Sequence, residues 1–296
     1  MRLMAALPTF ILRGVSDVLY FLLYYIIAYR KAVTSGNLQK AFPEKTAKEL
    51  LLLKKKFYHH LADIIIENIV IQYYSKRRLE KMFQFENPEL IDAYFETGRP
   101  IILITGHYGN WEWASPLSYT FNHKLLAVYK PLKNPYFDKA YIKSRTRFGG
   151  EAVPMRRIGR VLFQYNEKKI ATLTGMVGDQ RPIRQQTQFW TSFLDQQTAV
   201  FTGSEKLAKK FNAVVVFMEV RKTQRGKYLA SIKLITDTPR QTAEFEITEK
   251  HTRMLEALIL EDPAYWLWSH RRWKISYEQW LEMEGSTKQK DTSGKK

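Results

Sequence analysis

Two titratable side chains in one glycine-containing stretch have the chemistry of an acid–base pair, namely His107 and Glu112. An unperturbed imidazole titrates at about 6.5 and suits proton transfer near neutral pH. A carboxylate that accepts a hydrogen bond from one ring nitrogen would leave the other nitrogen as a general base. On one continuous helix the five-residue spacing corresponds to about 500° of rotation, which would not align the pair. We therefore expect His107 in a turn and Glu112 in the first turn of a following helix.

The sequence offers this base no obvious protein nucleophile. The chain has no cysteine and no Gly-x-Ser-x-Gly elbow, so the base is expected to activate a hydroxyl of a substrate. A metal site would need further ligands, but no second histidine stands at ligand spacing and no helical His-Glu-x-x-His occurs. We therefore predict no metal.

The elements that must position His107 begin with a buried strand. Residues 101–105 are Ile-Ile-Leu-Ile-Thr, bounded by Pro100 and Gly106, which is typical of a buried strand. Open α/β sheets bind ligands beyond the carboxyl ends of their strands. Strand patterns alternate with helix patterns along most of the chain, which predicts an α/β fold with a mostly parallel central sheet covered by helices. The further strands are expected at 124–128, 170–173, 213–218 and 228–235. The helices are expected at 48–74 (with its start signalled at 42–44), 87–98, 110–121, 134–148, 158–166, 202–211 and 245–260.

Two further polar features lie on the predicted helix 48–74. His59 and His60 fall on the face opposite its apolar stripe, so we expect both to face solvent. Glu67 and Asn68 lie within an apolar turn, and we expect neighbouring groups to satisfy them.

The charge balance favours acidic partners. Lys and Arg number 47 against 29 Asp and Glu, a formal net charge of +18. Nucleic acid, anionic lipid and an acidic carrier protein would all fit this charge. The basic residues are spread out, however, and no glycine-rich phosphate loop or RNA-recognition signature is present. We therefore expect no nucleic acid. The absence of cysteine excludes disulfides and is compatible with a reducing compartment.

The N-terminal segment predicts a membrane anchor. Residues 18–29 are almost wholly apolar or aromatic, and Arg30 and Lys31 follow directly, which does not resemble a cleavage site. The run is shorter than the ~20 residues of a full span, although it becomes long enough if it extends back across Asp17 and Arg13. A spanning helix and an interfacial helix both remain open, as does a buried core helix. The basic pair places the following domain on the cytoplasmic side. We divide the chain into an anchor (1–33), a catalytic domain (34–284) and a disordered basic tail (285–296).

Four blocks of sequence resemble one enzyme family. The stretch from Thr105 to Glu112 resembles the His-x-x-x-x-Glu motif of the bacterial late acyltransferases of lipid A biosynthesis, the lauroyl and myristoyl transferases. These are relatives of the lysophospholipid acyltransferases, which usually carry Asp at the second position. Residues 129–135 with 145–149, residues 178–180 and residues 266–274 resemble further blocks of the family in the same order. The resemblance therefore covers nearly the whole chain, including the N-terminal anchor.

This resemblance implies a glycerolipid acyltransferase-like fold and a reaction. An acyl chain would move from acyl-carrier protein to a hydroxyl of a lipid A precursor. His107 would deprotonate that hydroxyl, and Glu112 would orient and stabilise the imidazolium. Donors for the developing charge on the thioester carbonyl would be backbone N–H groups or Asn110. No cofactor is implied, because the acyl donor is carried on the phosphopantetheine of the carrier protein.

The remaining site residues are also implied by the resemblance. Arg145, with Arg147, would hold a phosphate of the acceptor or of the phosphopantetheine, because the guanidinium fork suits phosphate. Asp179 and Gln180 would shape the site from the adjacent loop. The alternatives are a surface-charge role for the two arginines and a loop cap for Asp179.

The resemblance further implies a place and partners. The protein would lie at the inner (cytoplasmic) membrane with its catalytic domain on the cytoplasmic side, and would take part in lipopolysaccharide biosynthesis. Its partners would be acyl-carrier protein, a lipid A precursor or other anionic lipid, and the membrane. The alternatives are a lysophospholipid or amino-acid-lipid acyltransferase of the same fold, and a non-catalytic lipid-binding membrane protein.

Overall fold

A seven-stranded sheet forms the centre of the molecule. The computed structural model describes residues 2–114, 117–132 and 134–283, so the predicted tail 285–296 lies outside the described residues. The strand order is β1-β9-β8-β2-β5-β3-β4, and every neighbouring pair is parallel except β8 with β9. The strands are β1 (Phe83–Phe85), β2 (Ile101–Thr105), β3 (Lys124–Tyr129), β4 (Glu151–Pro154), β5 (Thr172–Val177), β8 (Val214–Gln224) and β9 (Lys227–Thr236). The predicted mostly parallel α/β sheet is confirmed.

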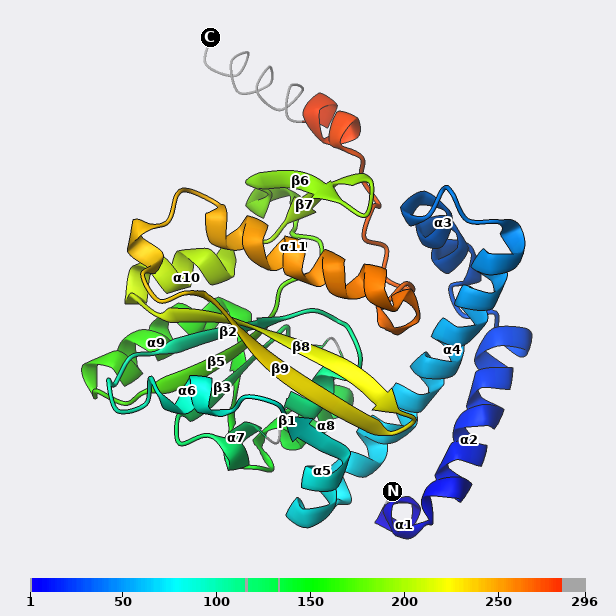
Figure 1. The fold of residues 1–296 in the computed structure, drawn as a ribbon, viewed down its shortest axis with the longest axis horizontal. Helices are drawn as coiled ribbons and strands as arrows, with labels where there is room; N and C mark the ends of the chain where they lie inside the picture. Colours follow the sequence, from blue (N-terminus) through cyan, green and yellow to red (C-terminus); the bar gives the residue numbers. More distant parts are fainter. Residues whose placement is uncertain (1, 115–116, 133, 284–296) are drawn as a thin grey trace.

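Helices cover both faces of this sheet (Figure 1). Along β2, Ile102 and Ile104 join one apolar core, while Ile101 and Leu103 join the other. This explains why the strand is apolar at successive positions rather than at alternate ones. The helices that follow β1 to β4 are α6 (Glu89–Asp92), α7 (Leu117–Thr120), α8 (Pro135–Thr146) and α9 (Ile158–Glu167). Helix α10 (Gly203–Phe211) precedes β8, and α11 (Glu246–Glu261) follows β9.

The N-terminal helices pack along one side of the sheet. They are α1 (Arg2–Ala6), α2 (Thr9–Phe21) with its π-helical continuation η1 (Leu22–Ile26), α3 (Lys31–Ala41), α4 (Ala47–Val70) with the 3₁₀ turn η2 (Ile71–Tyr73), and α5 (Lys76–Met82). Helix α4 begins at Ala47, after the start signal at 42–44. Thr46 is its N-cap and forms a capping box with Glu49, which satisfies two backbone N–H groups of the first turn.

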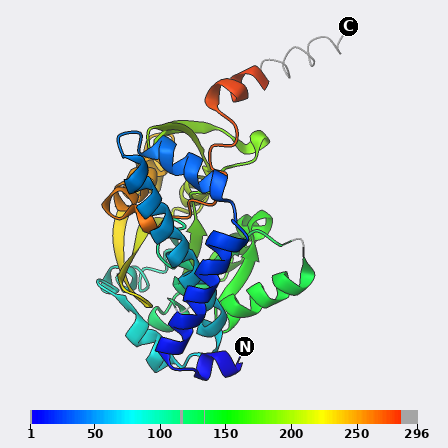
Figure 2. The same cartoon turned by 90° about the vertical axis from the view of Figure 1, so that its right-hand side faces the viewer.

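The stretch Thr9–Ile26 is a helix long and apolar enough to cross a membrane, by length and composition. In the structure it lies alongside α4 (Figures 1 and 2). Leu12, Ser16 and Tyr24 are buried on the inner side. The outward side exposes large apolar residues, among them Phe10, Val18, Phe21 and Ile26. An apolar face on a docked helix suits insertion into one side of a bilayer.

Several elements differ from the sequence prediction, among them strand β1, which the sequence did not reveal. A two-stranded antiparallel hairpin, β6 (Phe189–Phe193) and β7 (Gln196–Val200), occupies a region that we left without structure. Strand β4 is a further element that the sequence did not reveal. The predicted helix 110–121 consists of the 3₁₀ turn η3 (Trp111–Ala114) and the short helix α7. Because of this turn, Glu112 points in a different direction from the one that a continuous helix would give it.

Candidate active site

His107 and Asp179 meet because they follow neighbouring parallel strands. Strands β2 and β5 pair in a register that sets Thr105 opposite Val177, and the N–H of Gly178 donates to the carbonyl of Thr105 at 2.9 Å. Each polar residue comes two positions later. The carboxyl edge of the sheet is where open α/β folds place ligands, so both side chains lie where that rule predicts.

Asp179 holds the imidazole of His107. Its Oδ1 is 2.5 Å from His107 Nδ1, and its Oδ2 accepts the backbone N–H of His107 at 3.0 Å and the indole N–H of Trp266 at 2.8 Å. Burial alone would raise the pKa of Asp179, but His107 and Trp266 outweigh it and hold that pKa well below its ordinary value. An ionised carboxylate can only accept, so Nδ1 carries the proton.

The other ring nitrogen of His107 is then an acceptor in the neutral imidazole. The side-chain amide of Gln180 lies on it, with 3.0 Å between Gln180 Nε2 and His107 Nε2. Gln180 is exposed, whereas His107 has only 13% of its side chain exposed. A substrate hydroxyl could displace this amide and donate to the same lone pair. Such an arrangement has the geometry that a general base oriented by a buried carboxylate requires.

Glu112 does not occupy the position that we expected for it. Its carboxylate accepts two hydrogen bonds from Arg145 Nη2, at 2.9 and 3.0 Å, and one from the indole of Trp111 at 3.1 Å. The 3₁₀ turn directs it toward α8 instead of back to the imidazole. Asp179 holds Nδ1, so the predicted contact between Glu112 and His107 is wrong in this structure. Trp111 lies between the two pairs, because its ring also packs edge-on against His107 with the centroids 4.8 Å apart.

Asn110 faces the protein interior. It is completely buried, and its Nδ2 donates to Glu67 Oε2 at 2.7 Å, an oxygen that also accepts from the hydroxyl of Tyr228. Burial raises the pKa of Glu67. The amide of Asn110 is thus engaged in fixing the turn after His107. This geometry does not support the expectation that Asn110 donates to a substrate.

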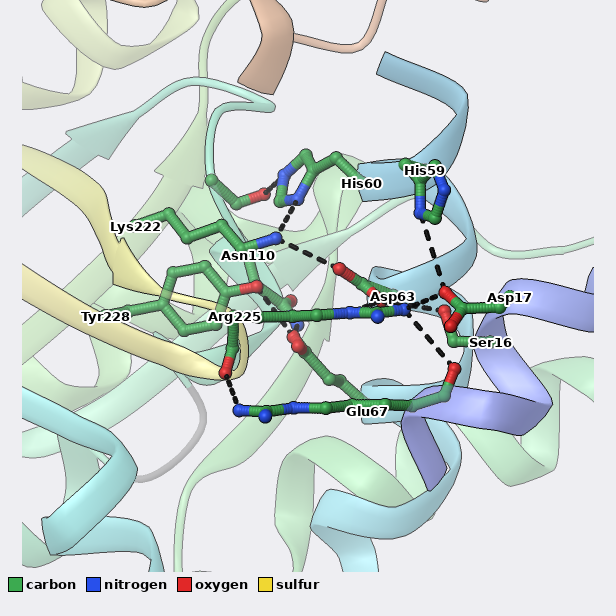
Figure 3. A network of polar contacts seen from close by, with 12 residues as sticks. Ser16, Asp17, His59, His60, Asp63, Glu67, Asn110, Lys222, Arg225 and Tyr228 are labelled. Carbon is green, nitrogen blue, oxygen red and sulfur yellow. Dashed lines mark hydrogen bonds and ion pairs between the residues drawn. The ribbon is translucent and has the colours of Figure 1, made fainter. Parts of the chain in front are cut away.

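The preceding residue, Gly109, is held by His60 of α4, which lies beside Lys222 in Figure 3. His60 Nε2 lies 3.2 Å from the carbonyl of Gly109, and Lys222 Nζ lies 3.4 Å from His60 Nδ1. Burial and Lys222 lower the pKa of His60 to about 3. The ring is therefore neutral and donates from Nε2 to the carbonyl. The prediction that His60 faces solvent was wrong, because the β8–β9 hairpin covers that side of α4.

Gly109 itself is required at its position. Its φ of +58° is in the left-handed region, and a Cβ there would lie 2.4 Å from the carbonyl oxygen of Val220. The backbone of the loop also pairs with the C-terminal segment. Gly109 N–H donates to the carbonyl of Tyr265 at 3.0 Å, and Leu267 N–H donates to that of His107 at 3.1 Å. The segment 265–267 therefore helps to fix the loop as well as supplying Trp266.

The same polar network reaches the N-terminal helix (Figure 3). Asp63 accepts from Ser16 at 2.7 Å and from Lys222 at 3.0 Å. Arg225 joins Asp63 to Asp17, with distances of 2.8 and 2.6 Å. Burial alone would raise the pKa of Asp63, yet these cations hold it below the ordinary value. Helix α2 is thus attached to the domain by charged groups as well as by apolar packing.

The two arginines of the predicted phosphate site have different surroundings. Arg145 lines a narrow cavity of about 40 Å³ together with Glu112 and Trp111, and the rest of its wall is largely apolar: Leu103, Leu125, Ala127, Met176 and Val177. Arg147 donates to the carbonyls of Ile71 and Tyr74, both at 3.1 Å. These contacts fix the end of α4 and η2, which gives Arg147 a structural role that the sequence analysis did not include.

Among the described residues, no group of three His, Cys, Asp or Glu side chains is placed to hold a metal ion. Sequence reasoning missed the contributions of Trp266, Glu67 and His60. The first belongs to the C-terminal block that we singled out. The other two are polar residues on a helix that the topology packs against the loop.

Comparison with known proteins places the chain in a family. The model of the bacterial lipid A biosynthesis acyltransferases matches residues 1–275. The chain belongs to this family. Two proteins of Haemophilus influenzae are each described as a lipid A biosynthesis acyltransferase. One is 26% identical over 239 residues, which cover 78% of this chain and 72% of that protein. The other is 23% identical over 248 residues, which cover 83% of this chain and 78% of that protein. The lipid A biosynthesis lauroyltransferase of Escherichia coli is 21% identical over 250 residues, covering 84% of this chain and 80% of that protein.

The protein is therefore an acyltransferase. This family membership is the one that the four sequence blocks predicted. Residues from three of these blocks lie together in the structure. His107, Asp179 and Trp266 come from different blocks and form one hydrogen-bonded unit.

Proposed function

We propose that the enzyme moves a fatty acyl chain from acyl-carrier protein to a hydroxyl of a lipid A precursor, with His107 as general base. The observation that carries this proposal is the His107–Asp179 pair, which leaves Nε2 as the acceptor at the carboxyl edge of the sheet. Membership of the lipid A acyltransferase family supports the acceptor class. The carrier protein as donor rests on the sequence resemblance, and the +18 charge is consistent with an acidic carrier.

The proposed reaction runs through the two ring nitrogens of His107. The acceptor hydroxyl gives its proton to Nε2 while its oxygen attacks the thioester carbonyl. The imidazolium that forms keeps its Nδ1 proton on Asp179, whose charge stabilises it. When the tetrahedral intermediate collapses, the carbon–sulfur bond breaks and the thiolate takes the proton from Nε2. The products are the new ester and the free thiol of the carrier protein.

The pair of Glu112 and Arg145 takes a different part in this proposal from the one that the sequence suggested. Glu112 fixes Arg145 and Trp111 rather than His107. Arg145 then places a positive charge beside the mainly apolar cavity, where we propose that it holds a negatively charged or developing-negative group of the bound substrates. The apolar wall formed by Leu103, Met176 and Val177 would receive the first carbons of the acyl chain.

We further propose that the enzyme acts at the cytoplasmic face of the inner membrane. The exposed apolar face of α2, with Phe10, Val18 and Phe21, would enter the bilayer. The charged contacts of Asp17 and Asp63 with Arg225 would keep the catalytic domain close to the lipid surface.

A reconstituted transfer assay tests the proposal. The full chain in detergent or vesicles is incubated with acyl-acyl-carrier protein and either a lipid A precursor or a lysophospholipid, and products are identified by mass spectrometry. We expect an added acyl chain on the lipid A precursor. Acylation of the lysophospholipid alone would establish the alternative acceptor, and transfer to neither would contradict the enzymatic proposal.

The matching cellular test is lipid analysis of a strain that lacks the protein. We expect lipid A to lose one acyl chain, and the loss to be restored by the wild-type chain but not by His107→Ala. Restoration by His107→Ala would instead indicate a non-catalytic lipid-binding role.

A further inference from the structure

A second cavity lies outside the acid–base unit and holds an unusual set of donors. Its volume is about 150 Å³, and it lies between the β6–β7 hairpin, the loop after β5 and the C-terminal segment, which passes the hairpin in Figure 1. Its wall includes Arg181, Arg184, Trp190, Arg272, Trp273 and Trp280. We call it the Arg272 cavity.

Arg272 is a buried cation that has no counter-ion among the described residues. Its residue is 3% exposed, and its Nη2 donates to the carbonyl of Ala199 at 2.7 Å. Its Nε and Nη1 are buried and have no hydrogen-bond partner. Burial lowers the pKa of this guanidinium to about 10, with Asp179 opposing the change and Arg181 adding to it. Arg272 therefore remains charged at neutral pH.

Within the described chain no carboxylate forms an ion pair with Arg272. The carboxylate that influences it, Asp179, is already engaged by His107 and Trp266. Leaving a buried charge unpaired is unfavourable, and a native structure that retains one needs a reason for it. A ligand that brings its own negative charge supplies such a reason.

Two tryptophans add donors to the same cavity. The indole Nε1 atoms of Trp190 and Trp280 are buried without a partner, and an indole N–H can only donate. By contrast, the indole of Trp273 is satisfied by Thr198 Oγ1 at 2.7 Å. Among the described residues that line this cavity, every buried side-chain nitrogen or oxygen atom without a partner is thus a donor. A second guanidinium, that of Arg181, also lines the wall.

We propose that the Arg272 cavity is a phosphate-binding subsite, and that its occupant is a phosphate group carried by one of the two substrates. Phosphate offers several acceptor oxygens and negative charge, which match separate N–H donors around a buried cation better than a single neutral acceptor would. This inference deepens the proposed function and rests on it for the identity of the substrates.

The position of the cavity relative to the general base supports the assignment. Arg181 directly follows Gln180, whose amide lies 3.0 Å from His107 Nε2. The C-terminal segment that carries Arg272 also supplies Trp266 to Asp179. A phosphate bound here would therefore anchor its substrate next to the site of proton transfer.

A binding experiment with the full chain in detergent tests the subsite without measuring acyl transfer. Thermal unfolding is followed with inorganic phosphate, phosphopantetheine and glucosamine 1-phosphate, each at matched ionic strength and beside unphosphorylated pantetheine and glucosamine. We expect stabilisation by phosphopantetheine if the donor supplies the phosphate, or by glucosamine 1-phosphate if the acceptor does. Stabilisation by inorganic phosphate alone, or by no phosphorylated compound, would overturn the assignment.

Variants separate this site from general charge effects. Arg272→Gln should abolish the phosphate-dependent rise in Tm, whereas Arg271→Gln should respond like the wild type, since Arg271 is the exposed neighbour. Arg272→Met is the more diagnostic change, because it removes an unpaired buried charge. It should unfold at the wild-type temperature or higher without phosphate, and should not respond to phosphate. A lower Tm together with an unchanged phosphate response would show that Arg272 is structural.

Two conservative variants keep the test decisive if the Arg272 variants fail to fold. Trp190→Phe and Trp280→Phe each remove one N–H donor and retain an aromatic ring, so each should weaken the phosphate response several-fold. Unchanged responses in both would contradict the subsite. The response should also persist in His107→Ala, because that change leaves the cavity intact. If His107→Ala retains transferase activity while phosphate still binds, the proposed mechanism fails and the subsite stands.

Discussion

The imidazole of His107 is held by Asp179, which lies 72 residues later in the chain, with 2.5 Å between Nδ1 and Oδ1. The carboxylate five residues away, Glu112, is paired with Arg145 instead. The site therefore contains two separate pairs, His107 with Asp179 and Glu112 with Arg145, and the ring of Trp111 contacts both.

Asp179→Asn should impair the chemical step. The substitution keeps an acceptor for Nδ1–H but removes the charge that stabilises the imidazolium, so kcat should fall by about 10²–10⁴-fold. KM for both substrates should change little, since Asp179 touches the base and not the substrate. Steady-state kinetics with acyl-acyl-carrier protein checks this. A raised KM with unchanged kcat would mean that Asp179 binds substrate.

Glu112 and Arg145 should behave as one unit. Because Arg145 Nη2 donates to both oxygens of Glu112, either single change to Gln removes the same interaction. In a double-mutant cycle the effects of Glu112→Gln and Arg145→Gln on kcat/KM should therefore be non-additive, with a coupling of roughly 0.5–3 kcal/mol.

The corresponding cycle between Glu112→Gln and Asp179→Asn distinguishes our geometry from the one expected from sequence spacing. Since Glu112 contacts Arg145 and not His107, the coupling of Glu112 with Arg145 should exceed its coupling with Asp179. The reverse order would indicate that Glu112 acts on His107 directly.

Glu67 should make stability fall as pH rises. Burial raises its pKa in the folded protein above the ordinary value of 4.5, so folding favours the protonated carboxyl. Its contribution is fully present below 4.5 and is lost between 4.5 and the higher folded-state pKa, with a slope of at most about 1.4 kcal/mol per pH unit. Glu67→Gln should remove this part of the pH dependence, as measured by denaturant unfolding at several pH values.

Tyr228→Phe is the matched control for that measurement. It removes one of the donors to Glu67 Oε2 and leaves the carboxyl in place, so it should destabilise the fold by about 1–3 kcal/mol. Suppose that Glu67→Gln destabilises the fold as much as Tyr228→Phe does and leaves the pH dependence of stability unchanged. That result would contradict a raised pKa for Glu67 in the folded protein.

The outward face of α2 should control membrane association. Val18 and Phe21 are 61% and 52% exposed, so changing both to Asp should leave the fold intact. Each change should remove about 1.5–3 kcal/mol of favourable free energy of transfer into lipid. Flotation with anionic vesicles measures the effect. Phe163→Asp is the control, because Phe163 is similarly exposed (54%) but lies on α9. Equal flotation of all three proteins would contradict a role for this face.

The sequence was informative where local pattern determines structure. The apolar run 101–105 predicted a buried strand and placed His107 just beyond its end, and both features are found in the structure. The partner of His107 was not accessible in this way. Asp179 reaches it only because β5 is the neighbour of β2, and strand order cannot be read from the composition of the strands.

Two misplaced features have equally physical causes. The β6–β7 hairpin turns at Leu194 and Asp195, with φ of 50° and 57°, so it lacks the Asn-Gly or Gly signal by which such turns are usually recognised. The 3₁₀ turn at 111–114 replaces the helix that we expected to bring Glu112 back toward His107. In both places tertiary packing outweighed the local sequence preference.

The most direct test of the account is the rate of acyl transfer by His107→Ala from acyl-acyl-carrier protein to a lipid A precursor, measured beside its Tm. The imidazole lies at the edge of the sheet with 13% of its side chain exposed, so its removal should leave the fold and the Tm essentially unchanged. We predict that kcat falls by about 10²–10⁴-fold. A folded His107→Ala enzyme that keeps the wild-type kcat would contradict the assignment of His107 as the general base.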